Sequence, residues 1–159
     1  MIVNITNKLI ISKRMRELCT REYPGHPNGC PNYNKQPDCP PKCPPIHKYF
    51  NLKKKHWLVI VKFNIGKQAR RMKRKYPYWT DRQCRNVLYW QGGVRKELTD
   101  KCSKFIFKKG LNKRLAFALK PEAMGVNVFS TLHKIGIPIK KNPKKIVYKV
   151  ALIGVRKNV

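Results

Sequence analysis

Acidic residues are scarce in this sequence: 7 Asp and Glu stand against 37 Lys and Arg, so the 159 residues carry a formal net charge of +30. The 7 carboxylates are scattered, and the sequence contains neither a Ser/His/Asp pattern nor a phosphate-binding glycine loop. Hydrolytic chemistry needs two closely placed carboxylates or an activated nucleophile. The sequence therefore offers no support for a hydrolase.

Long hydrophobic runs are also missing. No apolar stretch reaches the roughly 18–20 residues that a membrane span requires, and Asn4, Asn7 and Lys8 interrupt the apolar character of the first residues. We therefore expect neither a transmembrane segment nor a signal peptide. These absences predict a soluble, cytoplasmic protein with no membrane partner.

Core-forming residues are plentiful by contrast. Hydrophobic residues make up 42% of the chain, and 3 Trp, 7 Tyr and 6 Phe are too many for a disordered basic tail. The length predicts one domain over residues 1–159. A compact domain with this charge repels itself, and a polyanionic partner whose phosphates neutralise the charge explains it best. Nucleic acid is the first candidate, and a strongly solvated surface or an anionic membrane surface is the alternative.

Local patterns predict an α+β fold. Apolar and β-branched runs over 57–65 and 146–155 predict two strands of a small sheet, whereas 114–119 fits a strand or a helix. We expect helices over three segments: 67–75, 81–108 with a possible break at Gly92 and Gly93, and 121–135. Thr80 and Gln83 have the spacing of a capping box, Pro121 suits a first helical position, and Gly136 suits a C′ position. The helices should cover one face of the sheet.

A loop over residues 19–46 interrupts this pattern. Eight of the 12 prolines fall in it, a density that no helix or central strand tolerates. Four cysteines at spacings C-x10-C-x8-C-x3-C accompany them: Cys19, Cys30, Cys39 and Cys43. Four thiolates can bind one zinc ion or one [4Fe–4S] cluster, and ligation would order the loop. The missing C-x2-C steps and three Cys-Pro pairs favour the cluster over zinc, while plain thiols without metal remain an alternative.

Two further cysteines lie outside the loop. If 81–108 is one helix, Cys84 and Cys102 are about 27 Å apart and cannot share a metal or a disulfide. We interpret both as ordinary apolar positions, although either could replace a loop cysteine as a ligand. His26 and His47 flank the loop and could also replace a cysteine, but a solvated loop histidine is the simpler interpretation.

Basic residues recur in clusters with aromatic residues between them. Aromatic stacking on unpaired bases combined with phosphate neutralisation is typical of RNA recognition, so the pattern favours RNA over duplex DNA. Trp57 is an expected core residue, whereas the turn at 76–79 should expose aromatic rings. The candidate nucleic-acid-binding residues are Lys53, Lys54, Lys55, Arg70, Arg71, Lys73, Arg74, Lys75, Tyr78 and Trp79.

Two segments carry a family resemblance. The loop GCPNYNKQPDCPP (29–41), followed after a basic spacer by WLVIVKF, resembles the GCPxYG…CPP opening of an uncharacterised prokaryotic family of predicted metal-binding proteins. The segment PEAMGVNVFSTLHKIGIPI (121–139) is similar to a later helix of that family, EAMGIDVFxTxxxxGxPI. The resemblance implies metal binding through Cys30 and Cys39, with Cys19 as counterpart of the first ligand. It implies no particular reaction.

Three functions fit these observations. The first is a small metal-binding protein that binds nucleic acid, preferably RNA, through its basic surface. The second is an iron–sulfur redox or sulfur-transfer enzyme, for instance in nucleic-acid modification, with only three cysteine ligands and an open iron site. The third is a non-catalytic subunit of a ribonucleoprotein complex.

Overall fold

The computed structural model describes residues 1–23, 25–110, 114–140 and 142–157, and its centre is a four-stranded antiparallel sheet. The strand order is β1-β2-β4-β3, formed by Ile2–Asn4, His56–Phe63, Val147–Val155 and Leu115–Ala118. The two predicted strands are thus confirmed as the central pair, and residues 115–118 form a strand rather than a helix. Strand β1 is not predicted, because three residues are too few for a recognisable pattern. The α+β class is confirmed.

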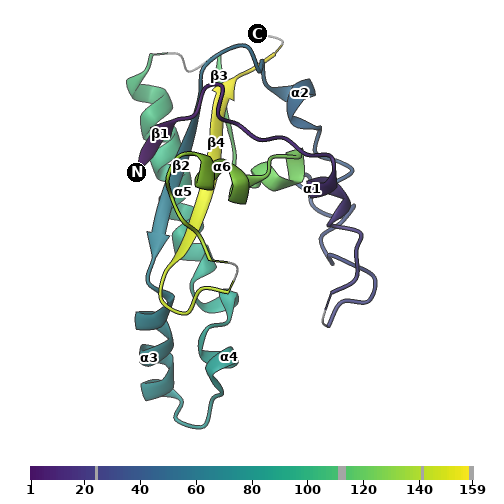
Figure 1. The fold of residues 1–159 in the computed structure, drawn as a ribbon. Coiled ribbons are helices and arrows are strands. Elements are labelled where there is room, and N and C mark those ends of the chain that lie inside the picture. Colours follow the sequence, from purple (N-terminus) through teal and green to yellow (C-terminus); the bar gives the residue numbers. More distant parts are fainter. Residues whose placement is uncertain (24, 111–113, 141, 158–159) are drawn as a thin grey trace.

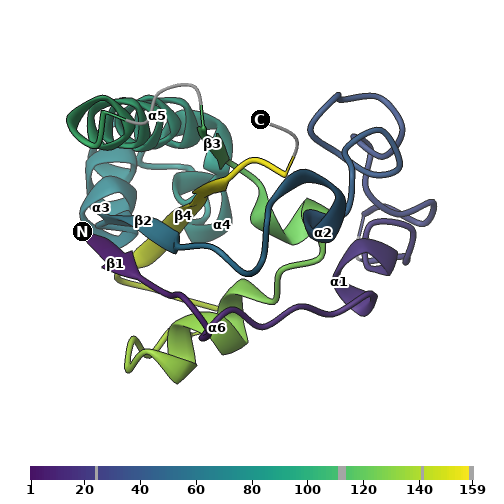
Figure 2. The same cartoon turned by 90° about the horizontal axis from the view of Figure 1, so that it is seen from above.

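Both faces of the sheet are buried. Along β2, Leu58 and Ile60 point into one hydrophobic cluster, and the alternate residues Val59 and Val61 point into another. Helix α5 (Gln91–Lys108) covers the second face, while α6 (Val128–Lys134) packs on the first (Figure 2). The expectation of helices on one face is therefore wrong. Because the apolar run in β2 places hydrophobic side chains on both faces of the sheet, other elements must pack on each face.

The predicted helix 81–108 is divided into three parts. Helix α4 (Asp81–Cys84) begins with the predicted capping box, in which Gln83 N–H donates to Thr80 Oγ1 over 3.2 Å. The short 3-10 helix η1 (Val87–Tyr89) follows, and α5 begins at Gln91. The chain turns before Gly92 rather than at it, and the Trp90 ring stacks on Phe63 at 4.8 Å between centroids. Burial of that ring against the sheet fixes the position of the break.

The predicted helix 121–135 is also divided. The 3-10 helix η2 (Pro121–Met124) ends at Gly125, whose φ of +98° no helix interior accommodates, and α6 follows. The end of α6 agrees with the prediction: Gly136 has a φ of +78°, and Ile137 N–H donates to Leu132 C=O over 2.9 Å. This pattern is a Schellman motif.

Two parts of the chain extend beyond the sheet (Figure 1). One is a hairpin of α3 (Ile65–Lys75) and α4 at the lower end of β2, which has its own small cluster of Ala69, Met72 and Cys84. The other is the cysteine-containing loop, which lies between α1 (Arg14–Glu17) and α2 (Ile46–Tyr49). Among the described residues, no helix is both long and apolar enough to cross a membrane.

Candidate metal centre and nucleic-acid interface

The first two loop cysteines are held side by side by the backbone. Cys19 lies just after α1, and the N–H of Cys30 donates to the Cys19 carbonyl over 2.8 Å. Gly29 makes this approach possible: its φ is +78°, and a Cβ on it would lie 2.7 Å from the Cys19 carbonyl oxygen. Only glycine combines that conformation with that space.

The other two loop cysteines are one turn apart. Cys43 N–H donates to the Cys39 carbonyl over 3.0 Å, and both side chains are buried, at 7% exposure for Cys39 and 5% for Cys43. Asn34 N–H donates to the Pro40 carbonyl over 2.8 Å, which closes the loop between the two pairs. Local hydrogen bonds, rather than helices or strands, thus order this segment.

Electrostatics indicate that the four thiols are neighbours. We call Cys19, Cys30, Cys39 and Cys43 the cysteine cluster. Burial raises the pKa of Cys19, and the negative charges that the other three thiols would carry raise it further. Nevertheless, no three His, Cys, Asp or Glu side chains in the described part of the chain are arranged to hold a metal ion. The sulfurs are close enough to repel one another as thiolates, but they do not converge on one point.

Two cations from outside the loop reach the cysteine cluster. Arg16 Nη1 lies 3.7 Å from Cys43 Sγ, and Lys120 Nζ lies 3.4 Å from Cys39 Sγ and 2.7 Å from Asp38 Oδ1. Burial would lower the pKa of Lys120, but its hydrogen bonds to Asp38 and Cys39 raise it. Cations beside sulfur stabilise the thiolate, the form that binds metal. Neither cation is predicted from sequence, because spacing alone does not reveal which distant residues fold onto the loop.

The thiol chemistry of the cysteine cluster suits a metal, but the side chains would have to move toward one point to bind it. Four cysteines suit tetrahedral zinc or a [4Fe–4S] cluster. Burial raises the pKa of Cys43, and its Sγ donates to the Ala123 carbonyl over 3.2 Å. Ligation by Cys43 would therefore require loss of this proton and of this contact.

Arg16 also links the cysteine-containing loop to η2, which lies in the second segment that carries the family resemblance. Arg16 Nη1 also donates to the carbonyl oxygens of Cys43 and Ala123, over 3.0 and 2.8 Å. The guanidinium thus joins the cysteine loop to η2, although Cys43 and Ala123 are 80 residues apart. The resemblance itself stays a prediction.

Cys84 and Cys102 lie elsewhere. Cys84 is 1% exposed in the hairpin cluster, and Cys102 is 0% exposed between α5 and the sheet. Burial raises the pKa of Cys102 to about 12, so it stays a thiol. Both match the interpretation as apolar positions, although the single long helix from which their separation follows is not formed.

The predicted nucleic-acid-binding residues form two groups at opposite ends of β2. Lys53, Lys54 and Lys55 are exposed in the turn that precedes β2, whereas the cations of α3 follow its other end. Eight strand residues span about 26 Å. The two groups therefore make separate basic surfaces.

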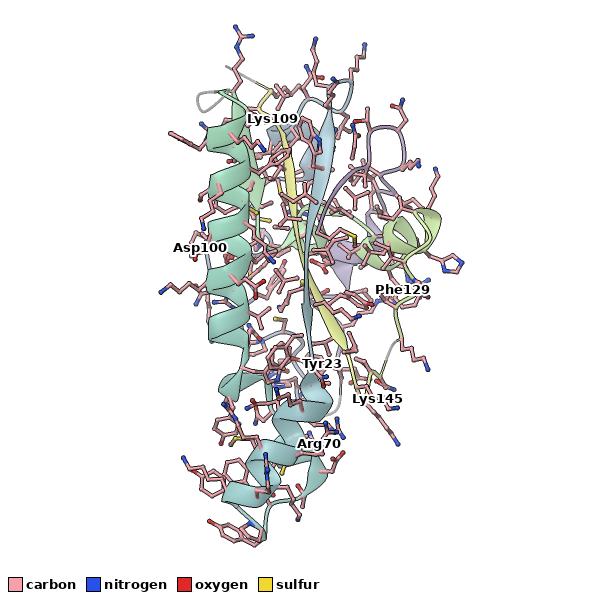
Figure 3. All side chains as sticks on the ribbon, turned by 90° about the vertical axis from the view of Figure 1, so that its left-hand side faces the viewer. Tyr23, Arg70, Asp100, Lys109, Phe129 and Lys145 are labelled. Atoms are coloured by element: carbon pink, nitrogen blue, oxygen red, sulfur yellow. The ribbon has the colours of Figure 1, made fainter. Side chains whose placement is uncertain are left out.

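Helix α3 carries the denser basic surface. Ile65, Ala69 and Met72 lie on its buried face, and the Asn64 side chain caps it by accepting from Lys67 N–H over 2.8 Å. The helix exposes six cations, five of them predicted: Lys67, Arg70, Arg71, Lys73, Arg74 and Lys75. Figure 3 shows this helix, marked by Arg70, below the sheet.

The hairpin turn exposes only one of its two candidate rings. Tyr78 is 81% exposed, whereas Trp79 is partly covered and stacks on Tyr76 at 4.2 Å between centroids. The Tyr89 ring also packs near Trp79, at 5.2 Å between centroids. Tyr78 is thus available to a ligand, and Trp79 mainly holds the turn together. Trp57 packs against Phe105 in the core, as expected.

Comparisons with known proteins add no assignment. No family model matches the chain, and neither a curated protein nor a solved structure is significantly similar to it.

Proposed function

We propose that this protein binds nucleic acid, preferably single-stranded or structured RNA, through its basic surfaces. The observation that carries the proposal is the excess of unpaired cations. The sequence contains 37 Lys and Arg, yet the described residues form three ion pairs: Arg85–Asp81, Lys101–Glu97 and Lys120–Asp38. The cations of α3, which form no ion pair among the described residues, lie near the exposed ring of Tyr78 and suit phosphates and bases together.

The proposal assigns an ordering role to the cysteine cluster. The loop is long and rich in proline, and local hydrogen bonds rather than helices or strands order it. A thiolate-bound zinc ion or [4Fe–4S] cluster would add folding energy to this segment. Arg16 and Lys120 would offset the negative charge of a four-thiolate centre. A cytoplasmic location, where thiols stay reduced, is part of this proposal.

Salt titration tests the nucleic-acid proposal. Each phosphate of a single strand that a protein cation neutralises contributes about −0.7 to the slope of log K against log salt. Five such contacts therefore predict a slope of about −3.5. We expect such a slope for a single-stranded RNA oligonucleotide, with tighter binding than to duplex DNA of equal length. Weak binding with a flat salt dependence for both nucleic acids would overturn the proposal.

Elemental analysis and substitution test the metal proposal. Protein purified anaerobically should contain about one zinc, or about four irons with a broad absorption band near roughly 400 nm. Serine at any position of the cysteine cluster should remove the metal, whereas Cys84→Ser, outside the cluster, should keep it. Metal-free protein whose loop is nevertheless ordered would contradict the proposed role.

A cavity beside Cys43 favours a second candidate, the redox or sulfur-transfer enzyme. This cavity has a volume of about 300 Å³, and its lining includes Asp38, Tyr49, Lys120 and Met124. A substrate there would lie next to a cluster that only three cysteines ligate. In that case, Cys43→Ser would keep a cluster with four irons, and the other three substitutions would lose it.

A further inference from the structure

A cleft lies between the hairpin and the segment that leads into β4. It has a volume of about 460 Å³, within the range of about 300–1,000 Å³ typical of ligand sites. The buried side chains of Ala69 and Cys84 form its floor. Its walls carry five cations and one carboxylate: Arg70, Lys73, Arg85, Lys144, Lys145 and Asp81.

The backbone holds these walls together. Gly66 N–H donates to the Lys145 carbonyl over 3.1 Å, and the Arg85 guanidinium donates to the Lys144 carbonyl. A Cβ on Gly66 would lie 3.2 Å from that Lys144 carbonyl oxygen, so the glycine allows the close approach. Cations from the hairpin and from the segment that leads into β4 thus line one cleft, although Arg85 and Lys144 are 59 residues apart in the chain.

The pKa of Asp81 is lowered by the cations around the cleft. The hydrogen bond from Arg85, with Arg85 Nε 2.8 Å from Asp81 Oδ2, lowers the pKa of this carboxyl, and the charges of Arg85, Lys144 and Lys73 lower it further. The same cations would attract an anion placed in the cleft. One carboxylate does not neutralise five cations, and a net positive charge is left for a ligand.

We propose that this cleft binds a phosphodiester group of single-stranded RNA while Tyr78 stacks on a neighbouring unpaired base. The two parts are connected: Lys73 lines the cleft, and its Nζ donates to the carbonyl of Trp79, next to Tyr78, over 2.6 Å. The inference deepens the proposed function and rests on it.

A charge-matched pair of triple variants tests the cleft. Arg70→Gln, Lys144→Gln and Lys145→Gln together remove three cleft cations whose side chains form no hydrogen bond or ion pair within the described residues. Lys8→Gln, Lys13→Gln and Arg14→Gln together remove the same charge from exposed positions near α1. The cleft variant should flatten the salt slope for RNA by about 2, since each lost contact removes about 0.7. The control should change it by less than half as much.

Tyr78 has its own test. Tyr78→Ala should weaken binding of single-stranded RNA by about tenfold, or about 1.4 kcal/mol, because it removes a stacking contact. The salt slope should stay unchanged, because stacking involves no charge. Tyr78→Phe should restore the affinity. Equal loss from Tyr78→Ala and Tyr78→Phe would contradict the stacking role.

The outcomes separate this inference from the proposed function. If the two triple variants reduce the salt slope of RNA binding equally, the protein still binds RNA but the cleft inference is wrong. If inorganic phosphate binds the cleft but does not compete with RNA, the cleft is a site for small anions and the inference also falls. If wild-type protein shows no salt-dependent binding to RNA, the proposed function itself fails.

Discussion

Single residues decide whether the cysteine cluster can form. Gly29 and Gly25 both have a positive φ, at +78° and +84°, but only Gly29 lies against another segment. A methyl group on Gly29 would meet the Cys19 carbonyl at 2.7 Å, whereas one on Gly25 would meet no described atom within 4 Å. Alanine substitutions at the two glycines can therefore distinguish the effect of backbone strain from that of a steric clash.

We predict that Gly29→Ala abolishes stoichiometric metal binding and that Gly25→Ala retains it. Both substitutions strain the backbone by about 1–2 kcal/mol, but only the first pushes Cys30 away from Cys19. Metal content after gel filtration, measured by elemental analysis, checks the prediction. Loss of metal in both variants would indicate that backbone strain alone destroys the site.

A second residue, His56, should make stability depend on pH. It is 2% exposed in β2, its Nε2 has no hydrogen-bond partner among the described residues, and burial lowers its pKa. Below the usual histidine pKa of about 6.5, His56 is therefore protonated in the unfolded chain but stays neutral in the folded protein.

We predict that the metal-free protein loses stability as the pH falls from 6.5 toward the lowered pKa of His56, by at most about 1.4 kcal/mol per pH unit. Above pH 6.5 the contribution is fully present. Urea unfolding at pH 7 and pH 5 measures the effect, and His56→Leu should remove it. Substitution of the exposed His133 should leave it unchanged.

At the scale of elements, the hairpin has a core of its own. Ala69, Met72 and Cys84 form a cluster distinct from the two that pack on the sheet. Small clusters of this kind open locally at lower free energy than the main core. The hairpin should therefore unfold without the sheet.

We predict that Met72→Ala lowers the local stability of the hairpin by about 2 kcal/mol, which reduces amide protection in α3 about 30-fold. Protection in β2 should stay unchanged. Native-state hydrogen exchange gives both values, and Leu58→Ala, in the sheet core, should instead lower protection throughout. A uniform loss in Met72→Ala would mean that the hairpin and the sheet unfold together.

At the scale of the whole molecule, repulsion between cations opposes folding. A formal charge of +30 with three ion pairs in the described part of the chain leaves most cations facing one another across water. Salt screens this repulsion over a Debye length of about 10 Å at 0.1 M. Salt should thus act oppositely on stability and on RNA binding.

We predict that the melting temperature of the free protein rises between about 0.02 and 0.3 M NaCl, by roughly 2–4 °C for each kcal/mol of repulsion relieved. Thermal unfolding followed by circular dichroism measures it. The Lys8, Lys13 and Arg14 triple variant should show a smaller rise. A melting temperature that falls with salt would mean that ion pairs, rather than repulsion, dominate the surface.

The sequence alone determined the features that depend on neighbouring residues. The central strands, the capping box at Thr80 and Gln83, the glycine at position 136 and the cationic face of α3 follow from local patterns, because their physical causes lie within one or two turns. The cysteine spacing predicts a metal site in the loop, which stays a prediction.

Tertiary structure decided what depends on distant partners. Trp90 breaks the long helix because Phe63 offers it a stacking partner, and β1 is a strand because β2 pairs with it. The cations near the cysteine cluster and the cleft beside Cys84 combine side chains from segments far apart in sequence. Burial and electrostatics act through space rather than along the chain, so only the folded chain reveals where these charges meet.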